Sequence, residues 1–252
     1  MTPGVRVIEV TGAPPGVTAV FTTRVGGVST AACAGLNLGI TSGDDLASVR
    51  ANRLALAAAC GFDPALAATL TQVHGAEVVE MGAAGGGGHY AGDLAGVGEA
   101  DALITRAPGV ALLAQGADCV PVLMWRADGS AVSCAHAGWR GLVAGVLEQA
   151  AGAVGPRVCG AAIGPCIGPC CYPVDAPLRD VMATRFGDDV VIGDAVDLRL
   201  VARRAMVGAG VDDGAIVDVQ ACTCCDAQRF YSYRRDGAHT GRQAGVIWRS
   251  AA

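Results

Sequence analysis

Lysine is absent from this chain of 252 residues, so all 18 of its strongly basic side chains are arginines. Without a lysine amine the protein cannot form a Schiff base, attach pyridoxal phosphate or build the lysine-containing phosphate loop of nucleotide hydrolases. The 23 acidic residues leave a net charge of −5, and no basic stripe runs along the sequence. We therefore expect no nucleic-acid partner.

Long apolar runs are also missing, although 52% of the residues are hydrophobic and only 4% are aromatic. No run approaches the roughly 20 residues that span a bilayer. The first residues lack the basic start and apolar stretch of a signal peptide. We expect a soluble, cytoplasmic protein with no membrane partner. The length suits one large domain or two small ones, and the lack of a linker or repeat favours a single domain over residues 1–252.

Disulfide bonds are not expected either. Eleven cysteines are many, but the count is odd, the chain is long and no export signal precedes it. These features favour reduced thiols. Most of the cysteines should pack as small apolar core residues.

Apolar periodicity and turn residues predict strands and helices that alternate irregularly. Strands are expected at residues 5–10, 18–23, 76–81, 102–106, 110–115, 120–125, 131–136, 158–163, 216–219 and 243–248. Helices are expected at residues 45–60, 141–154, 176–186 and 198–209. The irregular order favours a layered α+β fold over a doubly wound one. The glycine-rich stretch at residues 82–88 should form a mobile surface loop between two strands.

Three residues in compact motifs, His74, Cys119 and His136, suggest a metal centre. Only four histidines are present, and two of them join this cysteine at predicted strand ends or at a turn that enters a strand. A rigid sheet can hold ligands firmly at such positions. Two imidazoles and one thiolate suit a zinc ion with one coordination position open for a reactant. Residue types alone leave open that His74 is a turn residue and that Cys119 belongs to the core.

Strings that carry a family resemblance occur in order at residues 21–29, 36–39, 49–53, 72–75, 100–105, 117–123, 136–141, 163–168, 222–223, 230–236 and 240–242. Together they resemble the YfiH family, also called the laccase-domain or purine nucleoside phosphorylase family. The resemblance implies an α/β/β/α four-layer sandwich with mixed sheets, a monomer or nearly so, and zinc bound by His74, Cys119 and His136. It also implies phosphorolysis of adenosine, inosine, guanosine and methylthioadenosine, and deamination of adenosine.

Phosphorolysis requires an anion site beside a ribose pocket. The candidates are Arg24, Arg53 and Arg140, because a guanidinium can bind phosphate through two hydrogen bonds while it stays charged. Asn37 and Gln72 are candidate contacts to the sugar or the base. The alternatives are that Arg53 is a solvated helix residue, that Arg140 pairs with a carboxylate, and that the two amides form ordinary turn and strand hydrogen bonds.

Deamination requires a group that carries protons beside the zinc-activated water. The His-x-Glu motif of nucleic-acid deaminases is absent. Asp118, adjacent to Cys119, is the preferred catalytic candidate and could also accept a hydrogen bond from a ligand's N–H group. Glu77, three residues after His74, is the alternative.

The aromatic string that begins at Phe230 permits two interpretations. Tyr231, Tyr233 and Arg234 could line a purine pocket by stacking. The alternation over residues 230–234 equally describes a half-buried strand, which we favour, with at most one ring in the pocket. The other two histidines, at positions 89 and 239, are expected in loops.

Three other functions remain as alternatives. A polyphenol oxidase with several coppers needs more ligands than four histidines supply, although Cu²⁺ could occupy the zinc site. A metal-free cysteine hydrolase would use Cys119 as nucleophile and His136 as base. A scaffold with a separate zinc could use further cysteines, although these lack the two regular Cys-x-x-Cys pairs of zinc ribbons. Those cysteines are Cys166, Cys170, Cys171, Cys222, Cys224 and Cys225.

Overall fold

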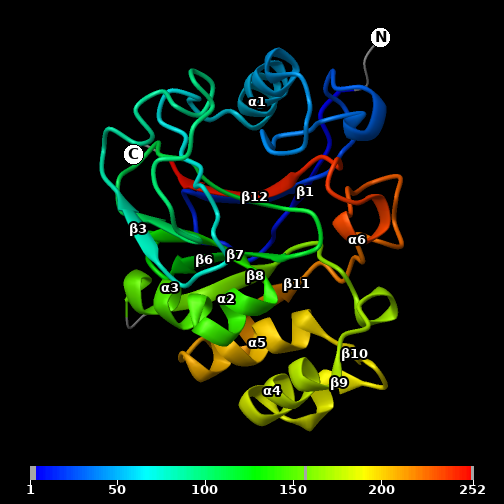
Figure 1. Ribbon diagram of the computed structural model, residues 1–252. Coiled ribbons are helices and arrows are strands. Elements are labelled where there is room, and N and C mark those ends of the chain that lie inside the picture. Colours follow the sequence, from blue (N-terminus) through cyan, green and yellow to red (C-terminus); the bar gives the residue numbers. More distant parts are fainter. Residues whose placement is uncertain (1–3, 156–157, 251–252) are drawn as a thin grey trace.

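Two β-sheets pack face to face between two layers of helices in the computed structural model, which describes residues 4–155 and 158–250 (Figure 1). Helix α1 (Leu46–Cys60) covers the outer face of the four-stranded sheet. The outer face of the six-stranded sheet is covered by α2 (Trp139–Ala144), α3 (Val146–Val154) and α5 (Leu198–Gly208), and α4 (Ala176–Phe186) packs against α2 and α5 farther from the sheet. This arrangement confirms the predicted α+β class and the four layers.

The four-stranded sheet joins the two ends of the chain. Its strands are antiparallel throughout. Because β12 lies between β2 and β5, the last strand of the chain is central to this sheet. The order across the sheet is β1 (Val7–Glu9), β2 (Val17–Thr22), β12 (Gln243–Arg249) and β5 (Leu112–Gly116).

The six-stranded sheet is mixed. Its two outer pairs are parallel and its inner pairs are antiparallel. The order across the sheet is β11 (Ile216–Asp218), β8 (Val158–Ile163), β6 (Val120–Arg126), β7 (Val132–Ala137), β4 (Ala102–Thr105) and β3 (Val78–Met81). Because β6 and β7 are central, side chains at their ends have rigid support.

Three hydrophobic clusters fill the three spaces between the layers. Side chains along β6 alternate between two of them: Val122 and Met124 face the helices, whereas Leu123 and Trp125 face the other sheet. The third cluster joins the outer face of the four-stranded sheet to α1. This alternation is the period-2 pattern expected for strands, and both faces are apolar because both are buried.

Aspartates begin three of the helices. The side chains of Asp45, Asp175 and Asp197 accept backbone N–H hydrogen bonds at the start of α1, α4 and α5. These caps satisfy donors that have no partner within the helix. At the other end of α1, Gly61 has a φ of 80°, a left-handed conformation that glycine adopts without strain.

Most predicted elements lie within two residues of the observed bounds, with two differences. The helix predicted at 141–154 is divided by Gly145, which has a φ of +92° and begins a second helix. The strand favoured at 230–234 is wrong: this segment is irregular and leads into the short helix α6 (Tyr233–Asp236). The short strands β9 (Val191–Ile192) and β10 (Ala195–Val196) were not predicted.

The glycine-rich stretch between β3 and β4 forms a series of turns at the surface. Part of it packs against a neighbouring loop. A Cβ atom on Gly85 or Gly86 would lie 2.2 Å from the carbonyl oxygen of Leu66 or Ala67. These two positions therefore require glycine for the close approach of two backbones.

Two expectations from composition can be compared with the structure. Ten of the eleven cysteines belong to the described side chains, and these ten are free thiols. Among residues 4–155 and 158–250, no helix combines the length and the apolar character that a membrane crossing requires.

Candidate metal centre

The side chains of His74, Cys119 and His136 converge at one end of the six-stranded sheet. His74 lies in the bend before β3, Cys119 directly precedes β6, and His136 is the second-to-last residue of β7. One donor atom from each of the three lies within 4.8 Å of the others. The Sγ atom of Cys119 is 4.0 Å from Nε2 of His74, and the two imidazole rings stand nearly perpendicular with centroids 4.8 Å apart. The three residues therefore share one site.

Strand pairing explains this convergence. Strands β6 and β7 pair with Pro121 opposite His136, and the same register continued by two residues brings Gly138 opposite Cys119. A Cβ atom on Gly138 would lie 3.0 Å from Sγ of Cys119 and 2.9 Å from Cδ2 of His74. Glycine at this position therefore leaves the space in which the ligands meet.

The backbone is strained on both sides of the site. His74 has a φ of +61° and Asp118 has a φ of +97°, both in the left-handed region that side chains other than glycine rarely adopt. Such conformations persist only where surrounding contacts enforce them, and they are concentrated at functional sites.

Asp101 fixes both histidines. Its Oδ1 accepts a hydrogen bond from Nδ1 of His136 at 2.8 Å, which leaves Nε2 of that ring directed toward the other donors. Its Oδ2 accepts from the backbone N–H groups of Gly75 and Val73, at 2.6 and 3.2 Å, and so holds the turn that carries His74. Burial acts to raise the pKa of Asp101, but His136 and the backbone N–H groups of Gly75 and His74 lower it overall, so the carboxylate stays ionised.

The electrostatics of the site favour a thiolate. Burial alone raises the pKa of Cys119, but the charge of His136 and hydrogen bonds from His136 and His74 outweigh burial and lower it to about 6. Burial likewise acts to lower the pKa of His136, but Cys119 and Asp101 raise it to about 9. A thiolate close to two imidazoles is a donor set that attracts a cation.

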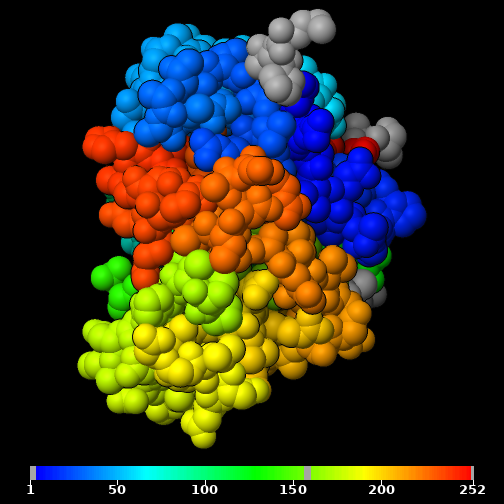
Figure 2. Space-filling model, turned by 90° about the vertical axis from the view of Figure 1, so that its right-hand side faces the viewer, coloured from blue at the N-terminus to red at the C-terminus, as the bar shows by residue number. Residues whose placement is uncertain are grey.

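Asp118 does not accept a hydrogen bond from a ligand's N–H group, so this part of its predicted role is wrong. Its carboxylate accepts from Oγ1 of Thr223 at 2.6 Å, from Oγ of Ser232 at 3.1 Å and from the backbone N–H of Arg234 at 2.6 Å. These bonds connect the strained residue beside Cys119 to the C-terminal part of the chain, which lies at the surface between the N-terminal part (blue) and the α4 region (yellow) in Figure 2. Asp118 still lines the cavity described next.

A cavity of about 670 Å³ opens onto the three donor residues. This volume is in the range typical of small-molecule sites. Tyr172 and Tyr233 line it, and so do Arg140, Arg234 and Arg242. The cavity therefore combines a candidate metal site with aromatic surfaces and several positive charges.

The arginines of the cavity differ in how many partners their guanidinium groups already have within the protein. Arg140 has no hydrogen-bond or ion-pair partner in the described part of the chain, and its guanidinium lies 4.3 Å from the ring centroid of Trp139. Arg234 stacks over the ring of Tyr172 at 5.0 Å and donates to the carbonyl of Pro173. Arg242 donates through Nη1 to two nearby carbonyls. Arg140 is thus the group most available to an anion.

Two other predicted binding residues line the cavity, and most of their polar side-chain atoms already have partners within the protein. The guanidinium of Arg53 is buried and donates to the carbonyls of Leu38 and Tyr90, at 3.0 and 2.7 Å. It is therefore not a solvated helix residue, and of its three nitrogens only Nη2 has no hydrogen-bond partner among the described residues. The amide of Gln72 exchanges two hydrogen bonds with the backbone of Gln115.

Arg24 and Asn37 are not among the residues that line this cavity. Arg24 donates to the carbonyls of Ala34 and Ala227, and its guanidinium lies 4.5 Å from the ring centroid of Tyr231. The buried amide of Asn37 is bonded within its own turn, for example to the carbonyl of Gly39. Both side chains hold the loops together, which accounts for polar residues at these positions.

Sequence reasoning missed three residues that shape the site: Asp101, Tyr172 and Arg242. Asp101 and Arg242 lie in strings that carry the family resemblance, but nothing in the spacing assigns them a contact. Of the residues in the C-terminal aromatic string, Tyr233 and Arg234 line the cavity, whereas Tyr231 is buried and donates to the carbonyl of Cys33. The two histidines expected in loops, at positions 89 and 239, do lie in turns.

The fold and the donor set together define a four-layer α+β protein with a His–Cys–His centre. The chain belongs to the family described as multi-copper polyphenol oxidoreductase laccase, which matches residues 18–250. It is 38% identical over 243 residues to purine nucleoside phosphorylase YfiH of Escherichia coli (strain K12), with 93% of this chain and 95% of that protein covered. It is also 38% identical over 236 residues to a purine nucleoside phosphorylase of Deinococcus radiodurans, with coverage of 90% and 87%.

Solved structures show the same fold. The crystal structure of YlmD from Geobacillus stearothermophilus has a TM-score of 0.84 at 32% identity and covers 95% of both chains. The crystal structure of the hypothetical protein YfiH from Bacillus licheniformis has a TM-score of 0.85 at 32% identity and covers 93% of both chains. The family resemblance seen in the sequence is therefore confirmed.

Proposed function

We propose that this protein is a zinc-dependent purine nucleoside phosphorylase. It would cleave adenosine, inosine, guanosine or methylthioadenosine with phosphate, giving the free base and the sugar 1-phosphate. The observation that carries this proposal is the cavity in which His74, Cys119 and His136 lie beside Arg140 and Arg242. The names of the relatives in Escherichia coli and Deinococcus radiodurans support the same activity.

Zinc fits the three donors. An ion about 2.0 to 2.3 Å from nitrogen and sulfur donors separates them by about 3.3 to 3.8 Å. The distance of 4.0 Å between Cys119 and His74 is close to this range. The space left by Gly138 and the ring orientation imposed by Asp101 also suit an ion. When bound, zinc would supply a Lewis acid with one coordination position open to the substrate. Copper binds the same donor types.

In phosphorolysis, an oxygen of phosphate forms a bond to C1′ of the ribose while the bond from C1′ to the purine nitrogen breaks. The unengaged guanidinium of Arg140 would bind the phosphate, with Arg242 as a second positive charge on the cavity wall. The ring of Tyr172 would stack on the purine. The departing purine takes up a proton, which water in the cavity would supply because both oxygens of Asp118 already accept hydrogen bonds.

Hydrolytic deamination of adenosine is the second candidate. The three-residue donor set with an open position is common to zinc deaminases, which supports it. Those enzymes also need a carboxylate that carries protons. Glu77 is exposed and does not line the cavity, and both oxygens of Asp118 already accept hydrogen bonds. Phosphorolysis is therefore the primary proposal.

A metal-free cysteine hydrolase is the remaining alternative. The lowered pKa of Cys119, the raised pKa of His136 and the bond from His136 to Asp101 resemble a catalytic Cys–His–Asp arrangement. Such an arrangement has no use for a second imidazole, yet His74 approaches the same sulfur. This second histidine favours the metal centre.

The test is to incubate purified protein with adenosine, with and without phosphate, and to separate the products by chromatography. Phosphorolysis predicts adenine and ribose 1-phosphate only when phosphate is present. Inosine formed in both samples would support the deaminase instead. A chelator should abolish either activity reversibly, whereas a cysteine hydrolase would keep its activity in chelator and lose it on alkylation. Neither product from metal-loaded protein would contradict both purine proposals.

A further inference from the structure

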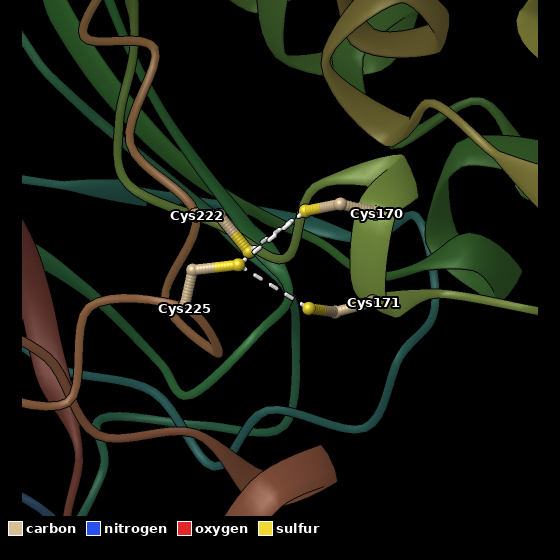
Figure 3. Close-up of side chains that lie close together, drawn as sticks. All are labelled: Cys170, Cys171, Cys222 and Cys225. Atoms are coloured by element: carbon tan, nitrogen blue, oxygen red, sulfur yellow. Dashed lines mark hydrogen bonds between the residues drawn. The ribbon is translucent and has the colours of Figure 1, made fainter.

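A second group of potential metal ligands lies outside the cavity. Cys170 and Cys171 belong to a single helical turn (Pro169–Cys171), and Cys222 and Cys225 belong to the loop that follows β11. Figure 3 shows the four sulfur atoms pointing toward one another from these two segments, and all four lie within 4.8 Å of one another. The proposed function gives these thiols no task.

The sulfur–sulfur distances match a single tetrahedral ion. They are 3.4 Å between Cys171 and Cys225, 3.5 Å between Cys170 and Cys225, and 3.7 Å between Cys170 and Cys222. Four sulfurs about 2.3 Å from a central zinc are separated by about 3.8 Å. A disulfide would bring two sulfurs to about 2.05 Å. The four thiols are thus too far apart for disulfides and correctly spaced for one metal ion.

Backbone contacts hold the two segments in register. Cys166 and Cys222 form a parallel bridge, in which the N–H of Thr223 donates to the carbonyl of Cys166 at 2.9 Å. The N–H of Gly168 donates to Sγ of Cys222 at 3.2 Å. A side chain on Gly168 would crowd Sγ of Cys170 at 3.3 Å. The sulfurs therefore meet because the main chain brings them together.

Arg235 fixes the second segment from the other side. Its Nη1 donates to the carbonyls of Thr223 and Cys224, at 2.9 and 3.0 Å. Cys222 and Cys225 are separated by two residues, the spacing with which one short loop supplies two ligands to zinc. Cys224 lies between them in sequence and is not part of the four-sulfur group.

We propose that Cys170, Cys171, Cys222 and Cys225 bind a zinc ion as four thiolates, in a structural site separate from the His–Cys–His centre. With four protein ligands the site is closed, so it offers no position to a substrate. Thiolate sulfur selects soft or borderline cations such as zinc over magnesium or calcium. The sulfurs are too close together to surround an iron–sulfur cluster, in which the four thiolates are divided among two or more irons.

Such an ion would brace one wall of the cavity. Tyr172, which lines the cavity, directly follows Cys171. Thr223, between Cys222 and Cys225, donates its hydroxyl to Asp118 beside the other metal centre. The zinc would hold both of these contacts in place without touching the reactants.

Metal counting by native mass spectrometry tests the proposal. After incubation with zinc and desalting, we expect two zinc ions in the wild-type chain. We expect one in the double variant Cys222→Ser/Cys225→Ser, one in Cys119→Ser, and none in the triple variant. The matched control Cys224→Ser should keep two. A zinc count that does not fall in the folded Cys222→Ser/Cys225→Ser variant, iron in place of this zinc, or loss of one zinc from Cys224→Ser would overturn the assignment.

Alkylation of the wild-type protein provides an independent test that does not require a variant to fold. Cys225 is exposed, so a free thiol there would react with iodoacetamide. We expect peptide mapping to show Cys225 protected in the zinc-loaded protein and modified after a strong chelator is added. Rapid modification in the presence of zinc, or a mass two hydrogens lower for a disulfide, would contradict the site. Neither result depends on whether the protein cleaves nucleosides.

Discussion

Replacement of Asp101 by asparagine should weaken the His–Cys–His centre without removing any of its ligands. The buried carboxylate accepts three hydrogen bonds: from Nδ1 of His136 at 2.8 Å, from the N–H of Gly75 at 2.6 Å and from the N–H of Val73 at 3.2 Å. Asparagine has one acceptor oxygen. Whichever way it turns, its NH₂ group faces either the imidazole N–H or the two backbone N–H groups.

The magnitude follows from this loss of orientation. Removing the partner that orients a metal-binding histidine typically costs about 10- to 100-fold in metal affinity. This corresponds to about 1.4 to 2.8 kcal/mol. We expect zinc affinity in Asp101→Asn to fall by that factor, while the thermal unfolding of the metal-free protein stays cooperative.

Competition with a chromophoric zinc chelator measures zinc affinity. The Cys119→Ser variant, which lacks the His–Cys–His site, shows which of the measured affinities belongs to that site. The matched control is Asp93→Asn, because Asp93 makes a similar bond to a histidine, His89, at 2.9 Å on the exposed surface. That variant should bind zinc as the wild type does. A folded Asp101→Asn protein with wild-type affinity would refute the reasoning.

Three further predictions concern the same cavity. Gly138→Ala should lose zinc from the centre, because its Cβ would lie 3.0 Å from Sγ of Cys119. Gly152→Ala, which has open space around the new Cβ, should keep the zinc, and metal analysis distinguishes the two variants. Arg140→Ala should raise KM for phosphate about 10- to 100-fold, as expected for a lost charge-assisted hydrogen bond, and Arg140→Lys should recover part of this loss. An equal rise in KM for the nucleoside would count against a role in phosphate binding. In metal-free protein, alkylation of Cys119 should become faster as pH rises through about 6, where its thiolate forms. Cys60, whose pKa burial raises to about 11, should stay unreactive over the same range. A midpoint above pH 8 for the alkylation rate of Cys119 would be inconsistent with the site.

The fold was largely predictable because buried strands and capped helices leave clear patterns. The apolar run of β6 and the aspartate that begins α1 are local signals. Local patterns failed where tertiary contacts decided the backbone. The alternation at residues 230–234 suits a strand, yet Ser232 accepts from the N–H of Arg235 and begins a helix there. A serine cap and an alternating pattern are both local signals, and only tertiary contacts decide between them here.

The metal ligands could be proposed from residue type, but the residues around them could not. Asp101 contacts His136 because β4 pairs with β7, with Ala102 opposite Ala135, and pairing between distant strands cannot be read from one sequence. Asp118 was preferred because it neighbours Cys119 in the chain. Its positive φ turns the carboxylate toward residues more than 100 positions away, such as Thr223.

The central claim is that His74, Cys119 and His136 hold a zinc ion on which nucleoside cleavage depends. The most direct measurement is the formation of ribose 1-phosphate from adenosine and phosphate, by chelator-treated protein before and after zinc is restored. We predict no product before, full recovery afterwards in the wild type, and no recovery in Cys119→Ser. Undiminished activity in the chelator-treated protein, or full recovery in Cys119→Ser, would contradict the account.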